Sequence, residues 1–202
     1  MPEVSVLITN HNYARFLGRC LRSVLTQTFP RSQYEVVLVD DGSSDNSHNI
    51  YNIFEKDLIV IENERNLGLP ASLNIGLGRC RGRYVVRVDS DDYIHTEMLS
   101  FLHTGHELLR SQYDAVSCDY FEVNEEGNDY KLKSALSNPI ACGVMFKNEV
   151  FETLGFYNEE MRIGEDVDLM KKFYASKLKL FNLNLPLYRY VNHGPSLSRE
   201  QR

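Results

Sequence analysis

Several residue types are scarce in this 202-residue chain, and each scarcity excludes a class of protein. There is no tryptophan, and there are four cysteines, Cys20, Cys80, Cys118 and Cys142, which form no CxxC pair. Cysteines scattered in this way argue against a zinc site or a disulfide framework, and they fit a reducing compartment. Cys20 falls on the apolar face of a predicted helix, so we expect it to pack in the core.

The sequence also lacks an excess of positive charge and any long apolar run. Lys and Arg number 22 against 28 Asp and Glu, a net charge of -6, so composition provides no general attraction to nucleic acid or to an anionic membrane. No apolar stretch approaches the roughly 18 residues of a membrane span. The first residues, MPEVSVLITN, lack the basic segment of a signal peptide. We therefore expect a cytoplasmic protein that binds no nucleic acid.

What the first half does contain is an alternation of short apolar runs and amphipathic segments. Apolar runs that predict strands lie at residues 4–8, 36–39, 58–61 and 84–88. Apolar residues recur at helical spacing after the first run, at Leu17, Cys20, Leu21, Val24 and Leu25. Pro70 suits the first turn of a later helix. This repetition predicts an α/β fold with a Rossmann-like, mostly parallel central sheet flanked by helices.

The pattern changes after residue 113. Strands are expected at 115–123 and 141–146, a short helix at 151–154, a helix from about 165, and extended segments at 181–185 and 187–191. We find no internal repeat and no linker. The sequence therefore predicts one domain over residues 1–202, with an α/β half at about 1–112 and a smaller mixed half at about 113–202.

Polar segments follow three of the predicted strands. They are TNHNY at 9–13, DDGSSD at 40–45 and DSDD at 89–92. In open parallel sheets, ligands bind beyond the carboxyl ends of the strands, which meet at one edge. We therefore expect these three segments to lie close together and to form a site.

The DDGSSD segment allows two interpretations. Asp40 and Asp41 end an apolar strand, and Gly42 with Ser43 predicts a tight turn. Carboxylates at this position can accept hydrogen bonds from a base N–H or a ribose hydroxyl. Alternatively, Asp40 or Asp45 caps the turn and the following helix. The sequence leaves both roles open.

The DSDD segment places Asp89, Asp91 and Asp92 within four residues. Such carboxylates repel one another unless water, a cation or a helix N-terminus offsets the charge. Mg²⁺ and Mn²⁺ take oxygen ligands, and strand alternation puts Asp89 and Asp91 on one side. The segment thus predicts a divalent metal site that would neutralise a diphosphate leaving group, with a solvated turn as the alternative.

The segment GEDVDLMKKF holds a candidate general base. If a helix begins near Glu165, Asp166 shares a face with Leu169 and Phe173 and points towards the interior or a cleft. Burial would raise its pKa and the helix N-terminus would lower it, a balance that suits proton abstraction from a hydroxyl. A capping role for Asp166 is the alternative. Asp168 is interpreted as a first-turn residue whose negative charge interacts favourably with the helix dipole. The role of Glu165 is left open.

Together these segments resemble the family 2 glycosyltransferases, a large inverting group with a GT-A fold. The resemblance runs in order through VSVLITNHNYARFLGRCLRSVLTQTF, EVVLVDDGSSDNS, NERNLGLPASLNIGLGRCRGRYVVRVDSDD and GEDVDLMKKF. Each segment alone is weak, whereas four segments in the right order and spacing are a specific signal.

The resemblance implies a role for each matching residue. The nucleotide base pocket would be lined by Thr9, His11 and Asp41 and supported by Asn10, Asn12 and Asp40, with Asn66 and Gly68 near the nucleotide. The DxD element would be Asp89 and Asp91, holding the ribose and the metal, with Asp92 assisting at the substrate. Asp166 matches the general base. His193 stands where related enzymes carry a histidine near the metal, so the expected ligands of Mn²⁺ or Mg²⁺ are Asp89, Asp91 and His193.

The implied activity is transfer of one sugar from a nucleotide-diphosphate sugar, UDP by family habit, to a hydroxyl acceptor. The acceptor would be a sugar or a lipid-linked glycan in glycan, lipopolysaccharide or capsule synthesis, in the cytoplasm or peripherally at the inner face of the membrane. Two departures from the family pattern matter. His11 replaces a common tyrosine or phenylalanine, and the QxxRW element of processive synthases is missing, so we expect a single transfer.

Other functions fit the residues less well. A phosphatase with a nucleophilic DxD expects that element near the start of the fold, whereas here it follows the fourth strand. A nucleotidyltransferase expects a Gly-rich basic loop at the N-terminus, which is missing. A nucleotide-sugar-binding domain that has lost catalysis is the non-enzyme alternative, and the presence of Asp89, Asp91 and Asp166 argues against it.

Overall fold

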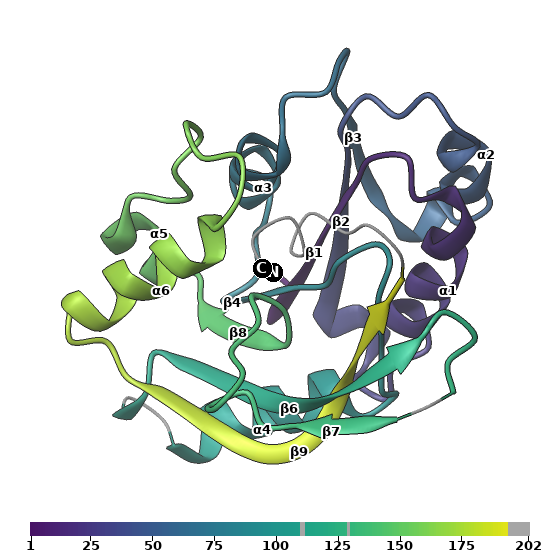
Figure 1. Cartoon of the computed structure of the whole chain (residues 1–202). Coiled ribbons are helices and arrows are strands. Elements are labelled where there is room, and N and C mark those ends of the chain that lie inside the picture. Colours follow the sequence, from purple (N-terminus) through teal and green to yellow (C-terminus); the bar gives the residue numbers. More distant parts are fainter. Residues whose placement is uncertain (110–111, 129, 194–202) are drawn as a thin grey trace.

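The computed structural model describes residues 1–109, 112–128 and 130–193 (Figure 1). The strands are β1 (Val4–Asn10), β2 (Tyr34–Asp40), β3 (Ile59–Glu62), β4 (Tyr84–Arg87), β5 (Tyr93–Ile94), β6 (Ala115–Asn124), β7 (Lys131–Lys133), β8 (Val144–Lys147) and β9 (Leu180–Asn192). The helices are α1 (Ala14–Leu25), α2 (Ser47–Asn52), α3 (Leu69–Leu77), α4 (Met98–Leu109), α5 (Glu149–Leu154) and α6 (Glu165–Ala175). Short 3₁₀ turns lie at Arg31–Gln33 and Glu55–Asp57.

The strands of the described residues form one sheet in the order β3-β2-β1-β4-β8-β6-β9-β5, with β7 paired to β6. Strands β3, β2, β1 and β4 are parallel, as the repeated strand and helix pattern predicted. Strand β8 is antiparallel to β4 and β6, while β6 and β9 run side by side in parallel. The predicted α/β first half and mixed second half are therefore confirmed.

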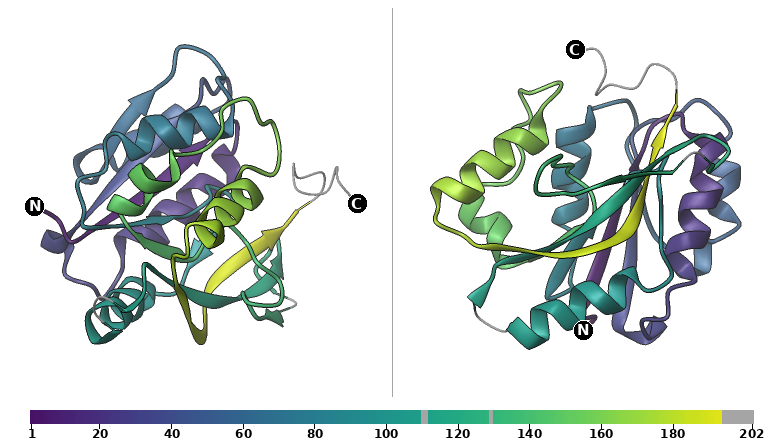
Figure 2. Two further views of the ribbon diagram at one scale, coloured as in Figure 1. Left: turned by 90° about the vertical axis from the view of Figure 1, so that its left-hand side faces the viewer. Right: turned by 60° about the horizontal axis from the view of Figure 1, so that its bottom comes forward.

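Helices cover both faces of this sheet, and nearly every residue of β1, β2 and β4 is accordingly buried. Val6 and Ile8 of β1 pack with residues of α1 and α4, whereas Leu7 between them packs with α3. The second face also receives α5 and α6, which lie on the opposite side of the sheet from α1 and α2 in Figures 1 and 2. Both faces of the parallel strands are buried, so a ligand would bind beyond the ends of these strands rather than on a face of the sheet.

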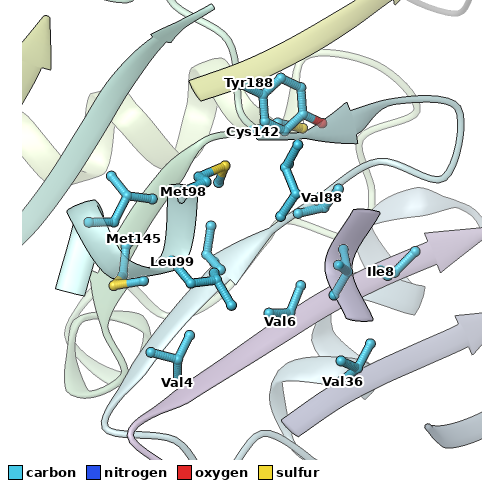
Figure 3. Close-up of a cluster of buried hydrophobic side chains, with 14 of the residues drawn as sticks. Val4, Val6, Ile8, Val36, Val88, Met98, Leu99, Cys142, Met145 and Tyr188 are labelled. Atoms are coloured by element: carbon cyan, nitrogen blue, oxygen red, sulfur yellow. The ribbon is translucent and has the colours of Figure 1, made fainter. Parts of the chain in front are cut away.

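One apolar cluster extends up to this edge (Figure 3). Val88, Cys142 and Tyr188 come from different parts of the chain and lie together at the end of β4. The Tyr188 hydroxyl accepts a hydrogen bond from the Asp89 N–H at 3.2 Å, which fixes the start of the DSDD segment on this cluster. Cys20 is fully buried in the same cluster, so its predicted packing role is confirmed.

The end of the chain differs from the prediction. The two extended segments expected around Pro186 form one strand, β9, which pairs with β6 through irregular register near Asp119. A proline within a strand is tolerated at such an irregularity, because no regular ladder hydrogen bond is lost there. The short strands β5 and β7 were not predicted. No helix of the described residues is long and apolar enough to cross a membrane.

Candidate active site at the carboxyl edge of the parallel strands

The segments after β1 and β2 lie side by side, as predicted. Asn10 and Asp40 are register neighbours in the sheet, and the Asp41 N–H donates to the Asn10 carbonyl at 2.7 Å. The Asn10 side chain donates to Asp40 Oδ1 at 2.8 Å, and the Ser43 hydroxyl donates to the same oxygen at 2.6 Å. Both Asn10 and Asp40 are buried. Asp40 therefore braces the turn, which agrees with a supporting role.

Asp41 is also buried, and its carboxylate is directed to the chain. Its Oδ1 accepts hydrogen bonds from Asn63 Nδ2 at 2.9 Å and the Leu67 N–H at 2.8 Å. Its Oδ2 accepts from the Gly68 N–H at 2.9 Å, and the exposed Asn66 side chain accepts from that same N–H at 2.9 Å. Asp41 thereby places Asn66 and Gly68 beside the end of β2. Its contact with a nucleotide base stays a prediction.

Gly42 allows the two loops to approach. Its φ is +65°, and a Cβ at this position would lie 2.5 Å from the Arg65 carbonyl carbon and 2.7 Å from the Asn66 nitrogen. These neighbours are backbone atoms, which cannot rotate away. Only glycine fits between the DDGSSD turn and residues 65–66.

His11 is half-buried, with a ring fixed by two hydrogen bonds. The Asp41 carbonyl can only accept, so His11 Nδ1–H donates to it at 2.7 Å. This leaves His11 Nε2 as the acceptor for Asn12 Nδ2 at 3.1 Å. The exposed Asn12 in turn accepts from the Ser44 N–H at 2.8 Å through Oδ1. Thr9, near the end of β1, is 8% exposed.

Asp45 joins this edge to two helices. Its Oδ2 accepts from the Ala14 N–H at the start of α1, and its Oδ1 accepts from the Ser47 N–H and hydroxyl at the start of α2. Burial alone would raise the pKa of Asp45, but the hydrogen bonds from Ser47 and Ala14 outweigh it and lower the pKa. The capping alternative is thus the correct one for Asp45.

Asp91 meets His193, which lies 102 positions later in the chain. Asp91 Oδ2 and His193 Nε2 are 2.7 Å apart, and the His193 side chain is 7% exposed. The His193 ring stacks on Phe16 at a centroid distance of 4.8 Å and meets the edge of Tyr13 at 5.5 Å. Burial and then the charge of Asp89 raise the pKa of Asp91, against the opposing effect of His193. Residues after His193 in the GPSLS tail lie outside the described residues.

Asp92 is the most deeply enclosed carboxylate of the DSDD segment. Its side chain is 1% exposed, with Oδ2 accepting from the Tyr188 hydroxyl at 2.6 Å and Oδ1 from the Val191 N–H at 2.7 Å. Both oxygens therefore hold β9 in place. Burial, together with Asp91 and Asp89, raises its pKa well above the usual value. In this structure the chain itself occupies the Asp92 carboxylate, and a contact of Asp92 with the substrate stays a prediction.

Asp89 has a different partner from Asp91. The buried Arg87 guanidinium donates to Asp89 Oδ1 through Nε at 2.7 Å and to Oδ2 through Nη2 at 3.3 Å. Arg87 Nη1 also donates to Glu165 Oε1 at 3.1 Å. The Asp89 side chain remains 26% exposed. Oxygen atoms of Asp89 and Asp92 and the Cys142 sulfur lie within 4.8 Å of one another.

Helix α6 begins at Glu165, as predicted, but its inner face is not the expected one. Glu165 is 7% exposed and turned inward to Arg87, followed on the same side by the buried Leu169. Asp166 is half-buried, and its Oδ1 accepts from the Val167 N–H at 2.8 Å. The interior position in the first turn thus belongs to Glu165, whereas Asp166 lies nearer the surface.

Sequence reasoning missed the residues that hold the site in place. Arg87, Tyr188 and Phe16 position Asp89, Asp92 and His193 respectively. Arg87 had a visible signal, because one charged residue within the apolar run YVVRV requires a buried partner. Phe16 and Tyr188 carried none, since each is an ordinary apolar position of a helix or strand.

Comparison with known proteins decides the family. The sequence model of the family described as "Glycosyl transferase family 2" matches residues 5–171. The chain belongs to this family. Among curated family relatives, glycosyltransferase GlyA of Streptococcus pneumoniae is 33% identical over 98% of this chain, which spans 32% of GlyA.

Solved structures agree on the fold of this family 2 chain. TarS residues 1–349 of Staphylococcus aureus, solved in complex with UDP-GlcNAc, superposes with a TM-score of 0.85 at 23% identity, over 98% of this chain and 61% of TarS 1–349. The mannosyltransferase PcManGT of Pyrobaculum calidifontis, in complex with GDP-Man and Mn²⁺, gives 0.74 at 22% identity, over 96% and 58%. The predicted GT-A fold is therefore confirmed.

Proposed function

We propose that this chain binds a nucleotide-diphosphate sugar and transfers the sugar to a hydroxyl acceptor with inversion. Membership of glycosyl transferase family 2 supports the reaction class. The observation that carries the proposal is the contact of Asp91 with His193 at 2.7 Å, because it brings two metal-ligating side chain types to the edge where ligands bind.

The residues at this edge fit a divalent cation. Asp91 and His193 would hold it, with Asp89 beside them, and a carboxylate with an imidazole suits Mn²⁺ better than Mg²⁺, which prefers oxygen ligands. The raised pKa of Asp91 reflects burial and repulsion from Asp89, which a positive charge would relieve. When bound, the cation would neutralise the diphosphate leaving group.

The nucleotide would lie across the ends of β1 and β2. Thr9, His11 and Asp41 are the residues proposed to line the base pocket, supported by Asn10, Asn12 and Asp40. Asn66 and Gly68 would approach the nucleotide from the segment that Asp41 holds. Uridine is the proposed base, because TarS was solved with UDP-GlcNAc and matches the fold closely.

Asp166 is the proposed general base. It lies in the first turn of α6, next to Glu165, which Arg87 connects to Asp89. Asp166 would accept the proton of the acceptor hydroxyl while the oxygen displaces the diphosphate from the opposite face, a single step that inverts the anomeric carbon. The half at 113–202 would form the acceptor side, for a sugar or a lipid-linked glycan in glycan, lipopolysaccharide or capsule synthesis.

Calorimetric titration tests the donor and metal sites together. UDP, UDP-GlcNAc and GDP-Man are titrated with and without Mn²⁺ into the wild type, Asp91→Ala and the surface control Asp57→Ala. We expect Mn²⁺-dependent binding of one nucleotide type, weakened at least about tenfold in Asp91→Ala, which corresponds to about 1.4 kcal/mol, and unchanged in Asp57→Ala. Binding that ignores both Mn²⁺ and Asp91→Ala would refute the metal site.

Turnover separates an enzyme from a domain that only binds the donor. Asp166→Asn keeps the size of the side chain but removes the basic carboxylate. We expect this variant to bind nucleotide as the wild type does and to lose at least about a hundredfold in sugar release or transfer. Equal turnover of the wild type and Asp166→Asn would exclude Asp166 as the base.

A further inference from the structure

We propose that Arg87 is a positioning residue that couples donor binding at Asp89 to the placement of the base-bearing first turn of α6. The inference rests on the proposed function and adds to it a residue that the family resemblance did not supply. We refer to Arg87, Asp89 and Glu165 as the Arg87 bridge.

The first support is the geometry of the guanidinium. Two of its nitrogens, Nε and Nη2, donate to the two oxygens of Asp89 at 2.7 and 3.3 Å, and the third, Nη1, donates to Glu165 at 3.1 Å. A planar fork with fixed donors can serve two carboxylates at once in a defined orientation. A lysine ammonium is a point charge and cannot reproduce this arrangement.

The second support is the position of Arg87 and Glu165 in the sheet and in α6. Arg87 is the last residue of β4, in register with Leu7 of β1, so its backbone belongs to the centre of the sheet. Glu165 is the first residue of α6, which has Gly164 before it at φ +84° and no side-chain cap. The Glu165 carboxylate therefore ties an otherwise uncapped helix start to the sheet.

The third support is burial. The Arg87 side chain is 8% exposed and that of Glu165 is 9% exposed, whereas Asp89 is 26% exposed. The centre of the bridge and its Glu165 end are thus shielded from solvent, whereas its Asp89 end is open to a ligand.

A functional consequence follows from the charges. One guanidinium donates hydrogen bonds to two carboxylates. A ligand that binds Asp89 therefore changes the strength of the interaction between Arg87 and Glu165. Asp166 is the next residue along α6, and a small displacement of a catalytic group costs up to about a hundredfold in rate. Donor occupancy and the position of Asp166 are therefore linked through Arg87.

The test uses Arg87→Lys, Glu165→Gln and a matched control, Lys147→Met. Lys147 forms a partly buried ion pair with Asp114 at 3.1 Å, in β8 rather than at the carboxyl edge. Hydrogen exchange of residues 163–170 is measured without ligand and with UDP plus Mn²⁺, alongside kcat, KM for the donor and thermal stability.

In the wild type and Lys147→Met, we expect UDP plus Mn²⁺ to slow exchange at the start of α6. In Arg87→Lys this protection should be lost, and kcat should fall about tenfold to a hundredfold while UDP affinity changes less than kcat. Glu165→Gln, which keeps a hydrogen-bond acceptor, should lose part of the protection. The double variant should be no slower than Arg87→Lys alone, because both act through one bridge.

The outcomes are distinguishable. Protection of α6 in Arg87→Lys equal to that of the wild type, or additive losses of kcat in the double variant, would overturn the bridge. A loss of stability in Arg87→Lys with unchanged kcat would make it a structural ion pair only. A wild type that neither binds UDP with Mn²⁺ nor turns over a donor would refute the proposed function itself. If Arg87→Lys does not fold, Glu165→Gln carries the same comparison.

Discussion

At the scale of single residues, burial sorts the acidic side chains of the site into two groups. Asp40, Asp41 and Asp92 are 6%, 4% and 1% exposed, and all accept hydrogen bonds from the chain. Asp89 and Asp91 retain more exposure and pair with cationic or imidazole side chains. The first group shapes the backbone of the site, whereas the carboxylates of the second group are more exposed to an incoming ligand.

Gly42 shows how closely the backbone of the site is packed, and a substitution of this residue tests that packing. Gly42→Ala places a methyl group against the backbone of residues 65–66 at a positive φ, so we expect the free energy of unfolding to fall by about 1–3 kcal/mol. UDP affinity should fall as well, because residues 66–68 would move. Urea denaturation and titration measure the two effects.

Gly78→Ala is the matched control for this substitution. Its added Cβ would meet no atom nearer than 3.5 Å, and its φ is -61°. This variant should be as stable as the wild type or more stable by about 0.4–1 kcal/mol, through a smaller entropy of the unfolded chain. A Gly42→Ala protein as stable as Gly78→Ala would show that residues 65–66 can retreat.

At the scale of helices and strands, α4 and β8 are joined by a buried histidine. His106 Nε2 donates to the Met145 carbonyl at 2.9 Å, and the ring stacks on Tyr84 at a centroid distance of 4.3 Å. Burial lowers the pKa of His106 from 6.5; the hydrogen bond to Met145 opposes this, while Lys147 and His103 lower it further. The folded state therefore prefers the neutral ring.

This preference fixes the sign of a pH effect. A histidine with a lowered pKa in the folded state contributes stability above pH 6.5, and the contribution is lost as the pH falls through 6.5 towards the lowered value. His106→Gln keeps the N–H donor but cannot titrate. We expect the wild type to lose more stability than His106→Gln between pH 7.5 and 5.5, by up to about 1.4 kcal/mol per pH unit. Parallel curves from urea denaturation would contradict this.

The elements also show how far the sequence could predict the fold. The four parallel strands and the helices between them were predictable, because each is a local run with clear periodicity and a defined turn at its end. Strand β5 has two residues and β7 has three, and both exist only through pairing with distant strands. Strand β9 crosses Pro186, where local rules expect a break. These three depend on tertiary contacts that no local pattern contains.

The same limit applies to the site. The residue pattern indicated Asp91 and the start of α6, the family resemblance added His193, and the structure brings Asp91 and His193 together. The sequence could not decide which of two adjacent side chains is buried, because a shift of one residue in a helix or turn exchanges the buried position for an exposed one. Glu165 rather than Asp166 is buried, and Asp92 rather than Asp91 is enclosed. Such choices follow from the backbone path around Arg87 and Tyr188.

At the scale of the whole molecule, the two halves share one sheet and one site. Strand β4 of the first half pairs with β8 of the second, and β5 pairs with β9. The contacts of Asp91 with His193 and of Arg87 with Glu165 also cross between the halves. We therefore propose that the described chain behaves as one domain in unfolding, and that neither half forms the site alone.

Scanning calorimetry of the full chain tests this unity. We expect one transition with equal calorimetric and van't Hoff enthalpies, because neither half can unfold without exposing the strands of the other half to water. UDP plus Mn²⁺ at about 100 times the dissociation constant should stabilise the folded state by about 2.7 kcal/mol, which raises Tm by about 5–10 °C for a chain of this size. The whole transition should move if the ligand contacts both halves as proposed, and Asp91→Ala should not respond. Two transitions, of which UDP and Mn²⁺ shift only one, would mean that the halves fold separately and that His193 lies outside the binding site.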